Sequence, residues 1–157
     1  MFPKFLTIFF ISMVPLIELR GAIPIALGMD LPVLPSILVC VIGNMLPVPV
    51  IYLFARKFLL WGTKQPHICK FCNFFVVKGE NTGRKLTQKA GRWGSFFALM
   101  LFVGIPLPGT GAWTGTLAAS FLDIGPKTTA LSVSLGVILA GILMSVVSAL
   151  GLHIFGL

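Results

Sequence analysis

The chain has 157 residues, of which 57% are hydrophobic and only 10% are charged, and its formal net charge is +8. A soluble domain of this length could not cover so much apolar surface, so the composition excludes a soluble fold and predicts an integral membrane protein. A helix needs about 20 residues to cross a bilayer. The apolar stretches fall at residues 5–29, 31–55, 93–122 and 128–157.

The positive charge is concentrated in one polar segment. Of the 12 Lys and Arg residues, nine lie between Arg56 and Arg92. Basic residues beside membrane segments are retained on the cytoplasmic side, so we expect a multi-pass protein of the cell membrane whose 56–92 loop is cytoplasmic. This pattern also favours membrane lipids as partners and argues against nucleic acid.

The first apolar stretch contains a charged pair between two prolines. Glu18 and Arg20 lie inside Pro15-Leu-Ile-Glu-Leu-Arg-Gly-Ala-Ile-Pro24. Each ionised group costs roughly 2.5–3.5 kcal/mol at the centre of a spanning helix, so we expect the two to be paired or used. Together with Gly21, the prolines predict a broken helix over residues 5–29, interpreted as a re-entrant hairpin. The alternative is a kinked continuous span.

A spanning helix is predicted for residues 33–55, bent at Pro47 and Pro49. Asn44 is its polar candidate, either as part of a transport site or as an interhelical hydrogen-bonding group. The loop that follows contains His67, Cys69 and Cys72, one ligand short of a structural zinc site. We therefore predict no metal and no cofactor. The two histidines of the chain and the absence of a nucleophile–base pattern argue against an enzyme.

The second half repeats this order of parts. Trp93 starts an apolar stretch that is broken by Gly104-Ile-Pro-Leu-Pro-Gly-Thr-Gly-Ala-Trp113, with about half a bilayer of helix on either side. Residues 94–122 are therefore predicted to form a second re-entrant hairpin, and residues 128–155 a final spanning helix. The candidate residues at this break and at its ends are Arg92, Pro106, Pro108, Gly109, Thr110, Gly111 and Trp113.

The two halves predict an all-α membrane protein of two inverted repeats. Residues 1–55 form the first repeat, residues 56–92 the basic loop, and residues 93–157 the second repeat. Each repeat is a re-entrant hairpin followed by a transmembrane helix. Interrupted segments at corresponding positions of two halves indicate a transporter-like site at the repeat interface.

Glu18-Leu-Arg-Gly-Ala-Ile-Pro24, together with the second break, resembles the small multidrug export protein family, which is itself similar to the DedA and VTT-domain membrane proteins. The resemblance implies two facing re-entrant hairpins and movement of amphipathic or lipidic substrates, with coupling to protons. Glu18 and Pro24 match the first motif, and Pro106 and Pro108 match the proline region of the second. DedA proteins typically carry an arginine in the second motif, whereas none lies between Trp93 and Asp123 here. An arginine-dependent mechanism would therefore require Arg20 or Arg92 to take that role.

Three functions follow as alternatives. The first is a transporter that exports small cationic or amphipathic molecules against protons, with Glu18 as carrier and Arg20 as its modulator. The second is a translocase or scramblase of lipids or polyprenyl phosphates, in which Arg20 receives the phosphate. The third is a structural membrane protein. A chain of this size could enclose a pathway alone or as a homo-oligomer, and both alternatives stand.

Overall fold

The computed structural model describes residues 1–15, 17–64, 70, 77, 91, 93–107 and 110–155, and every regular element in them is an α-helix. Two stretches, Val33–Phe58 and Pro126–Gly151, are long and apolar enough to cross a membrane. The helices in chain order are α1 (Phe2–Met13), α2 (Glu18–Gly28), α3 (Val33–Met45), α4 (Pro47–Gly62), the helix Trp93–Gly104, α6 (Ala112–Phe121) and α7 (Pro126–Phe155).

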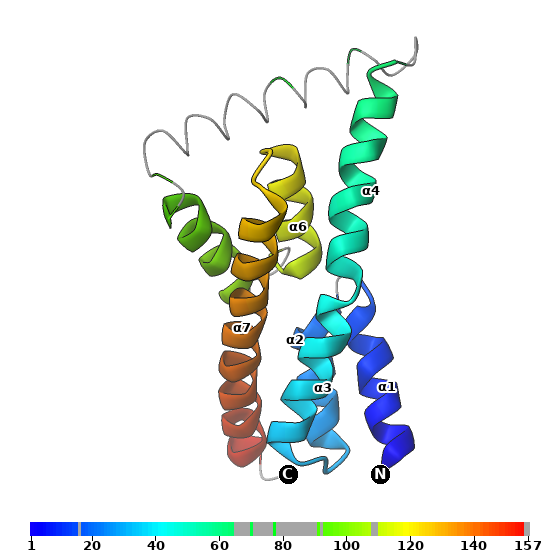
Figure 1. Cartoon of the computed structure of the whole chain (residues 1–157). Coiled ribbons are helices and arrows are strands. Elements are labelled where there is room, and N and C mark those ends of the chain that lie inside the picture. Colours follow the sequence, from blue (N-terminus) through cyan, green and yellow to red (C-terminus); the bar gives the residue numbers. More distant parts are fainter. Residues whose placement is uncertain are drawn as a thin grey trace.

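The helices α1 and α2 form a hairpin whose bend lies near the middle of the molecule (Figure 1). The first helix ends because Pro15 disfavours a helical conformation at the residue before it. Val14 is accordingly extended, with φ −71° and ψ 129°. The break predicted at Pro15 is therefore present.

Pro24 does not break the helix, so the prediction that both prolines interrupt residues 5–29 is wrong for Pro24. It lies inside α2, which runs without a gap from Glu18 to Gly28. A proline removes one hydrogen bond, here the one to the carbonyl of Arg20, and strains the turn before it. Buried packing of the same helix offsets this cost, since Leu19, Ala22, Ile23 and Ala26 all lie in the core.

The long apolar stretch that begins at Val33 is divided into two helices. α3 ends at Met45 and α4 begins at Pro47, so the predicted bend falls at Leu46. Proline is tolerated at the first position of a helix, where its missing N–H would be unpaired in any case. In Figure 1, α3 starts near the end of the molecule that carries both termini, and α4 reaches the opposite end.

A second helical hairpin is formed by the helix Trp93–Gly104 and α6. Figure 1 shows this hairpin approaching the middle of the molecule from the end opposite to the first hairpin, with α7 then running back towards the termini. The bend between its helices contains Pro106 and Gly111. The Gly/Pro pattern predicts a broken segment here, and the structure has two short helices joined by a bend.

Both hairpins end in the same backbone motif. The left-handed residues Asp30 (φ 59°) and Asp123 (φ 54°) follow α2 and α6. The N–H of the next residue donates back to a carbonyl of the last helical turn, from Leu31 to Ala26 at 3.1 Å and from Ile124 to Ala119 at 3.0 Å. This is the Schellman arrangement, which satisfies carbonyls that a helix end leaves free.

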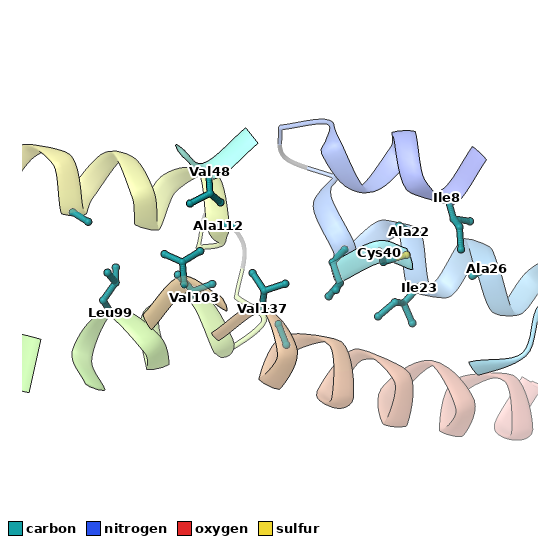
Figure 2. Packing of buried hydrophobic residues seen from close by; sticks show 14 of the residues in the cluster. Ile8, Ala22, Ile23, Ala26, Cys40, Val48, Leu99, Val103, Ala112 and Val137 are labelled. Atoms are coloured by element: carbon teal, nitrogen blue, oxygen red, sulfur yellow. The ribbon is translucent and has the colours of Figure 1, made fainter. Parts of the chain in front are cut away.

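The buried core draws on both halves. Figure 2 shows the labelled residues in two groups, one from α1, α2 and α3, and the other from Val48, the helix Trp93–Gly104, α6 and α7. The outer face of α7 is as apolar as its inner face, because Leu131, Leu135, Ile138 and Ile142 are all exposed. A continuous apolar outer surface suits contact with lipid rather than water.

Candidate functional site

Glu18 caps the N-terminus of a helix in the other half of the chain. Its carboxylate accepts hydrogen bonds from the backbone N–H groups of Ala112, at 3.2 Å, and of Trp113, at 3.0 Å. These donors belong to the first turn of α6, where N–H groups have no intrahelical partner and the helix dipole favours negative charge. The residue is only 5% exposed, so this contact takes the place of water around the carboxylate.

Gly111 makes this approach of the carboxylate to α6 possible. It precedes α6 with φ 154° and ψ −173°, a region that essentially only glycine adopts. A Cβ atom built at this position would lie 2.7 Å from the carboxyl carbon of Glu18 and would overlap its oxygens. The backbone therefore brings the two N–H groups to the carboxylate only if residue 111 has no side chain.

Arg20 binds the other helix of the same hairpin. Its guanidinium donates to the carbonyls of Val103 at 3.1 Å and Ile105 at 3.2 Å, and also to the carbonyl of Leu107. A further hydrogen bond, of 2.8 Å, goes to Oγ1 of Thr110. These acceptors lie at and beyond the C-terminus of the helix Trp93–Gly104, where carbonyls are unpaired and the dipole favours a cation.

Together these contacts form what we call the clasp: Glu18 on the start of α6, and Arg20 on the end of the helix Trp93–Gly104. The two charges do not bond each other, so the direct pairing considered from the sequence is replaced by pairing with the backbone of the other half. Within the described residues the one ion pair is Arg56 with Asp123, and both of its side chains are nearly half exposed. Buried charges need such hydrogen-bonding partners to be tolerated.

Asn44 lies beside the clasp. It lines a cavity together with Glu18, Arg20 and Ala112, and the cavity is too tight to admit a water molecule. The side chain is 2% exposed, and its Oδ1 has no hydrogen-bond partner among the described residues. A buried acceptor without a donor costs free energy, and this oxygen is the one polar atom of Asn44 that the described structure leaves unsatisfied beside the two charged groups.

Of the residues singled out from the sequence, the structure brings Glu18, Arg20, Thr110, Gly111 and Trp113 into direct contact through the clasp. Asn44 joins them through the shared cavity. Pro106 lies between Ile105 and Leu107, two of the three residues whose carbonyls accept from Arg20. Gly21 and Pro24 lie on α2 and form no side-chain hydrogen bond with the described residues of the second break. Arg92, Pro108, Gly109, His67, Cys69 and Cys72 lie outside the described residues.

The partners of the clasp that sequence reasoning missed are backbone groups. The carbonyls of Val103, Ile105 and Leu107 and the N–H of Ala112 carry no side-chain signature. One indirect signal was available, since Pro106 has no N–H and cannot satisfy a carbonyl of the preceding turn. Among the described residues, no group of three or more His, Cys, Asp or Glu side chains could hold a metal ion.

Comparison with known proteins places this chain in one family. Residues 18–143 match the family described as "Putative small multi-drug export protein". This range starts at Glu18, directly after the first break, and includes the second break and all partners of the clasp. No curated protein and no solved structure matches the chain significantly. Because the match covers most of the sequence, the chain belongs to the small multi-drug export protein family, whose name is that of a membrane transporter family.

Proposed function

We propose that this protein is a small membrane transporter that exports small cationic or amphipathic molecules in exchange for protons, with Glu18 as the group that binds them. The observation that carries the proposal is the contact of the Glu18 carboxylate with the first turn of α6. It links the two halves through one titratable group. The family assignment supports transport as the activity.

Protonation of Glu18 would weaken the clasp for a simple physical reason. The ionised carboxylate accepts two charge-assisted hydrogen bonds and is attracted by the helix dipole, whereas a neutral carboxyl forms hydrogen bonds about half as strong. A cationic substrate would be drawn to the same carboxylate and would neutralise it in the same way. Proton and substrate therefore compete for Glu18, which is the condition for exchange.

Asn44 supplies what the protonated state requires. A neutral carboxyl group donates one hydrogen bond, and neither N–H group of α6 can accept it. The unpartnered Oδ1 of Asn44 lines the same cavity as Glu18 and is an acceptor. In this proposal Glu18 alternates between the helix terminus of the second half when charged and Asn44 of the first half when protonated.

The proposed pathway lies between two re-entrant hairpins of inverted repeats. Support comes from the approach of the hairpins from opposite ends (Figure 1) and from their shared helix caps at Asp30 and Asp123. Buried positions also correspond between the halves. Ile8 and Ser12 match Leu99 and Val103, and Ser36, Cys40 and Gly43 match Thr129, Val133 and Gly136.

The clasp would act as the gate of this pathway. Its cavity admits no water in this conformation, so passage requires the hairpin tips to separate. Arg20 stays charged at all physiological pH values and keeps hold of one helix end, while Glu18 releases the other when it is neutralised. The charge of the basic loop favours the cytoplasmic side, so in this proposal export would run away from that side.

The test is transport by purified protein in proteoliposomes. Wild type is compared with Glu18→Gln and with Asp30→Asn, which changes a carboxylate to an amide in a turn outside the clasp. We expect efflux of a cationic dye to depend on an imposed pH gradient in wild type and Asp30→Asn, and to fall to the protein-free background in Glu18→Gln. Normal, pH-dependent efflux by Glu18→Gln would contradict the carrier role.

A second function is favoured by one specific feature of the clasp. The N-terminus of α6 is the kind of site that binds phosphate, Glu18 occupies it as a built-in anion, and Arg20 lies nearby. A lipid phosphate could displace the carboxylate in a translocase. Flipping of a fluorescent phospholipid in the same proteoliposomes without a pH gradient would support this function over exchange. The absence of both activities would support a structural role.

A further inference from the structure

A groove separate from the clasp lies between the start of α4 and the first turn of α7. Its volume is about 520 Å³, within the range of pockets that bind small molecules. It exists because the chain bends at Leu46, after which α4 packs on α6 and contacts α7 only weakly. The small side chain of Ala130 leaves the space between the two helices open.

Away from Lys127, the described residues that line the groove offer a ligand no unpaired polar group. Tyr52 and Thr129 line it, but both hydroxyls already donate to the carbonyl of Ile124, at 2.7 and 3.2 Å. The other lining residues away from Lys127 are apolar, among them Met45, Val48 and Leu53. An occupant must therefore be apolar along this length.

One end of the groove is positively charged. Lys127 lines it, is exposed, and has no hydrogen-bond or ion-pair partner among the described residues. It lies in the first turn of α7, where backbone N–H groups are unpaired and the dipole favours an anion. The carboxylate at this level, Asp123, is already neutralised by Arg56. The end therefore suits a negatively charged headgroup.

The groove opens towards the apolar exterior. Its outer edges are Pro49, Leu53 and Ala130, all exposed, on the two stretches that are long and apolar enough to cross a membrane. The first turn of α7, which carries Lys127, lies in the half of the molecule in which α4 ends and the basic loop begins (Figure 1). Anionic lipid headgroups gather beside basic segments of this kind.

We propose that this groove binds one acyl chain of an anionic phospholipid, whose phosphate contacts Lys127 and the first turn of α7. The apolar length takes the acyl chain, and Lys127 at its end selects for the headgroup charge. The site is independent of the clasp, and the proposal holds whichever substrate the protein transports.

Native mass spectrometry of the purified full-length protein tests this directly. The protein is exchanged into detergent with phosphatidylglycerol or with phosphatidylcholine of the same chains, and the retained lipids are counted. Wild type should retain one phosphatidylglycerol in preference to phosphatidylcholine. Lys127→Gln should lower that preference about fivefold, the effect of one lysine beside an anionic headgroup.

Two variants separate the groove from general surface charge. Lys57→Gln removes a neighbouring exposed lysine that does not line the groove, and it should leave the preference unchanged. Ala130→Phe fills the groove without altering charge and should abolish retention of both lipids. Equal losses in Lys127→Gln and Lys57→Gln, or unchanged retention in Ala130→Phe, would overturn the proposal. All three substituted side chains are exposed, and unchanged helical circular dichroism would verify the fold.

Discussion

At the scale of single residues, the buried charges are compensated by backbone dipoles. Glu18 is held by two N–H groups and Arg20 by three carbonyls and one hydroxyl, all from the other half of the chain. Each charge lies at the helix end of opposite polarity, the carboxylate at an N-terminus and the guanidinium at a C-terminus. The two charges therefore have separate sets of partners.

Gly111→Ala should destabilise the protein by roughly 3 kcal/mol, because the new methyl group would overlap the Glu18 carboxylate and force a backbone conformation open only to glycine. The measurement is thermal unfolding in detergent. Gly28→Ala is the matched control, since nothing lies within 4 Å of a Cβ at that position. A Gly111→Ala protein as stable as this control would show that the clasp contributes little to the fold.

Arg20→Lys should also destabilise the protein, by about 2 kcal/mol or a fall in Tm of roughly 4–8 °C. The charge is kept, but an ammonium group lacks the planar fork that reaches several acceptors at once. The control is Arg56→Lys, whose partner pair is half exposed and worth about 0–1 kcal/mol. Equal Tm values for the two variants would mean that charge alone, without the fork geometry, holds the hairpin tip.

At the scale of helices, each hairpin packs against the helix that follows it in the chain, α3 or α7, and a glycine of that helix lies at the contact. A Cβ at Gly43 of α3 would meet the carbonyl of Phe9 at 2.7 Å and overlap Oγ of Ser12 in α1. A Cβ at Gly136 of α7 would meet Val103 at 2.7 Å and the carbonyl of Met100 at 2.8 Å. Small residues at such crossings let helix backbones approach closely.

Gly43→Ala and Gly136→Ala should therefore each lower stability by about 1–3 kcal/mol, the cost of overpacking a filled contact. Gly151→Ala in α7 is the control, because a Cβ there meets nothing within 4 Å and alanine favours the helix. Chemical unfolding of the three variants in mixed micelles compares them. If only one of the two crossings is sensitive, the halves are not equivalent in packing.

At the scale of the whole molecule, both chain ends lie at one end of the structure, and α4 ends at the other (Figure 1). Four complete spans would put both termini on the side of the basic loop, whereas two hairpins and two spans put them opposite it. The arrangement of helices favours the second topology. With this topology, the charge of the loop predicts that the loop faces the cytoplasm and the chain ends face outside.

Labelling with an impermeant thiol reagent tests this topology. Single cysteines replace Phe2, Val77 or Gly156 in a chain without Cys40, Cys69 and Cys72. We expect the cysteines at 2 and 156 to react in intact cells and the cysteine at 77 to react only after permeabilisation. Protection of all three in intact cells would rule out the two-hairpin topology with a cytoplasmic loop.

The sequence by itself determined the membrane character, the bends at Pro15 and Pro47, and the second break around Pro106, because composition and proline act locally. It also singled out Glu18 and Arg20, since buried charges are costly wherever they occur. Pro24 shows the limit of local rules. Packing of α2 against its neighbours outweighed the loss of one hydrogen bond, so the helix continued.

Only the tertiary structure decided what the two charges bind. Apart from the Thr110 hydroxyl, their partners are backbone groups: the N–H of Ala112 and Trp113 and the carbonyls of Val103, Ile105 and Leu107. These groups lie 83 to 95 residues further along the chain than the charges that they bind. Every residue except proline carries the same backbone donor and acceptor, so a sequence cannot mark which ones will be used. They become available where a helix ends, and they meet a charge only when the two hairpin tips are folded together.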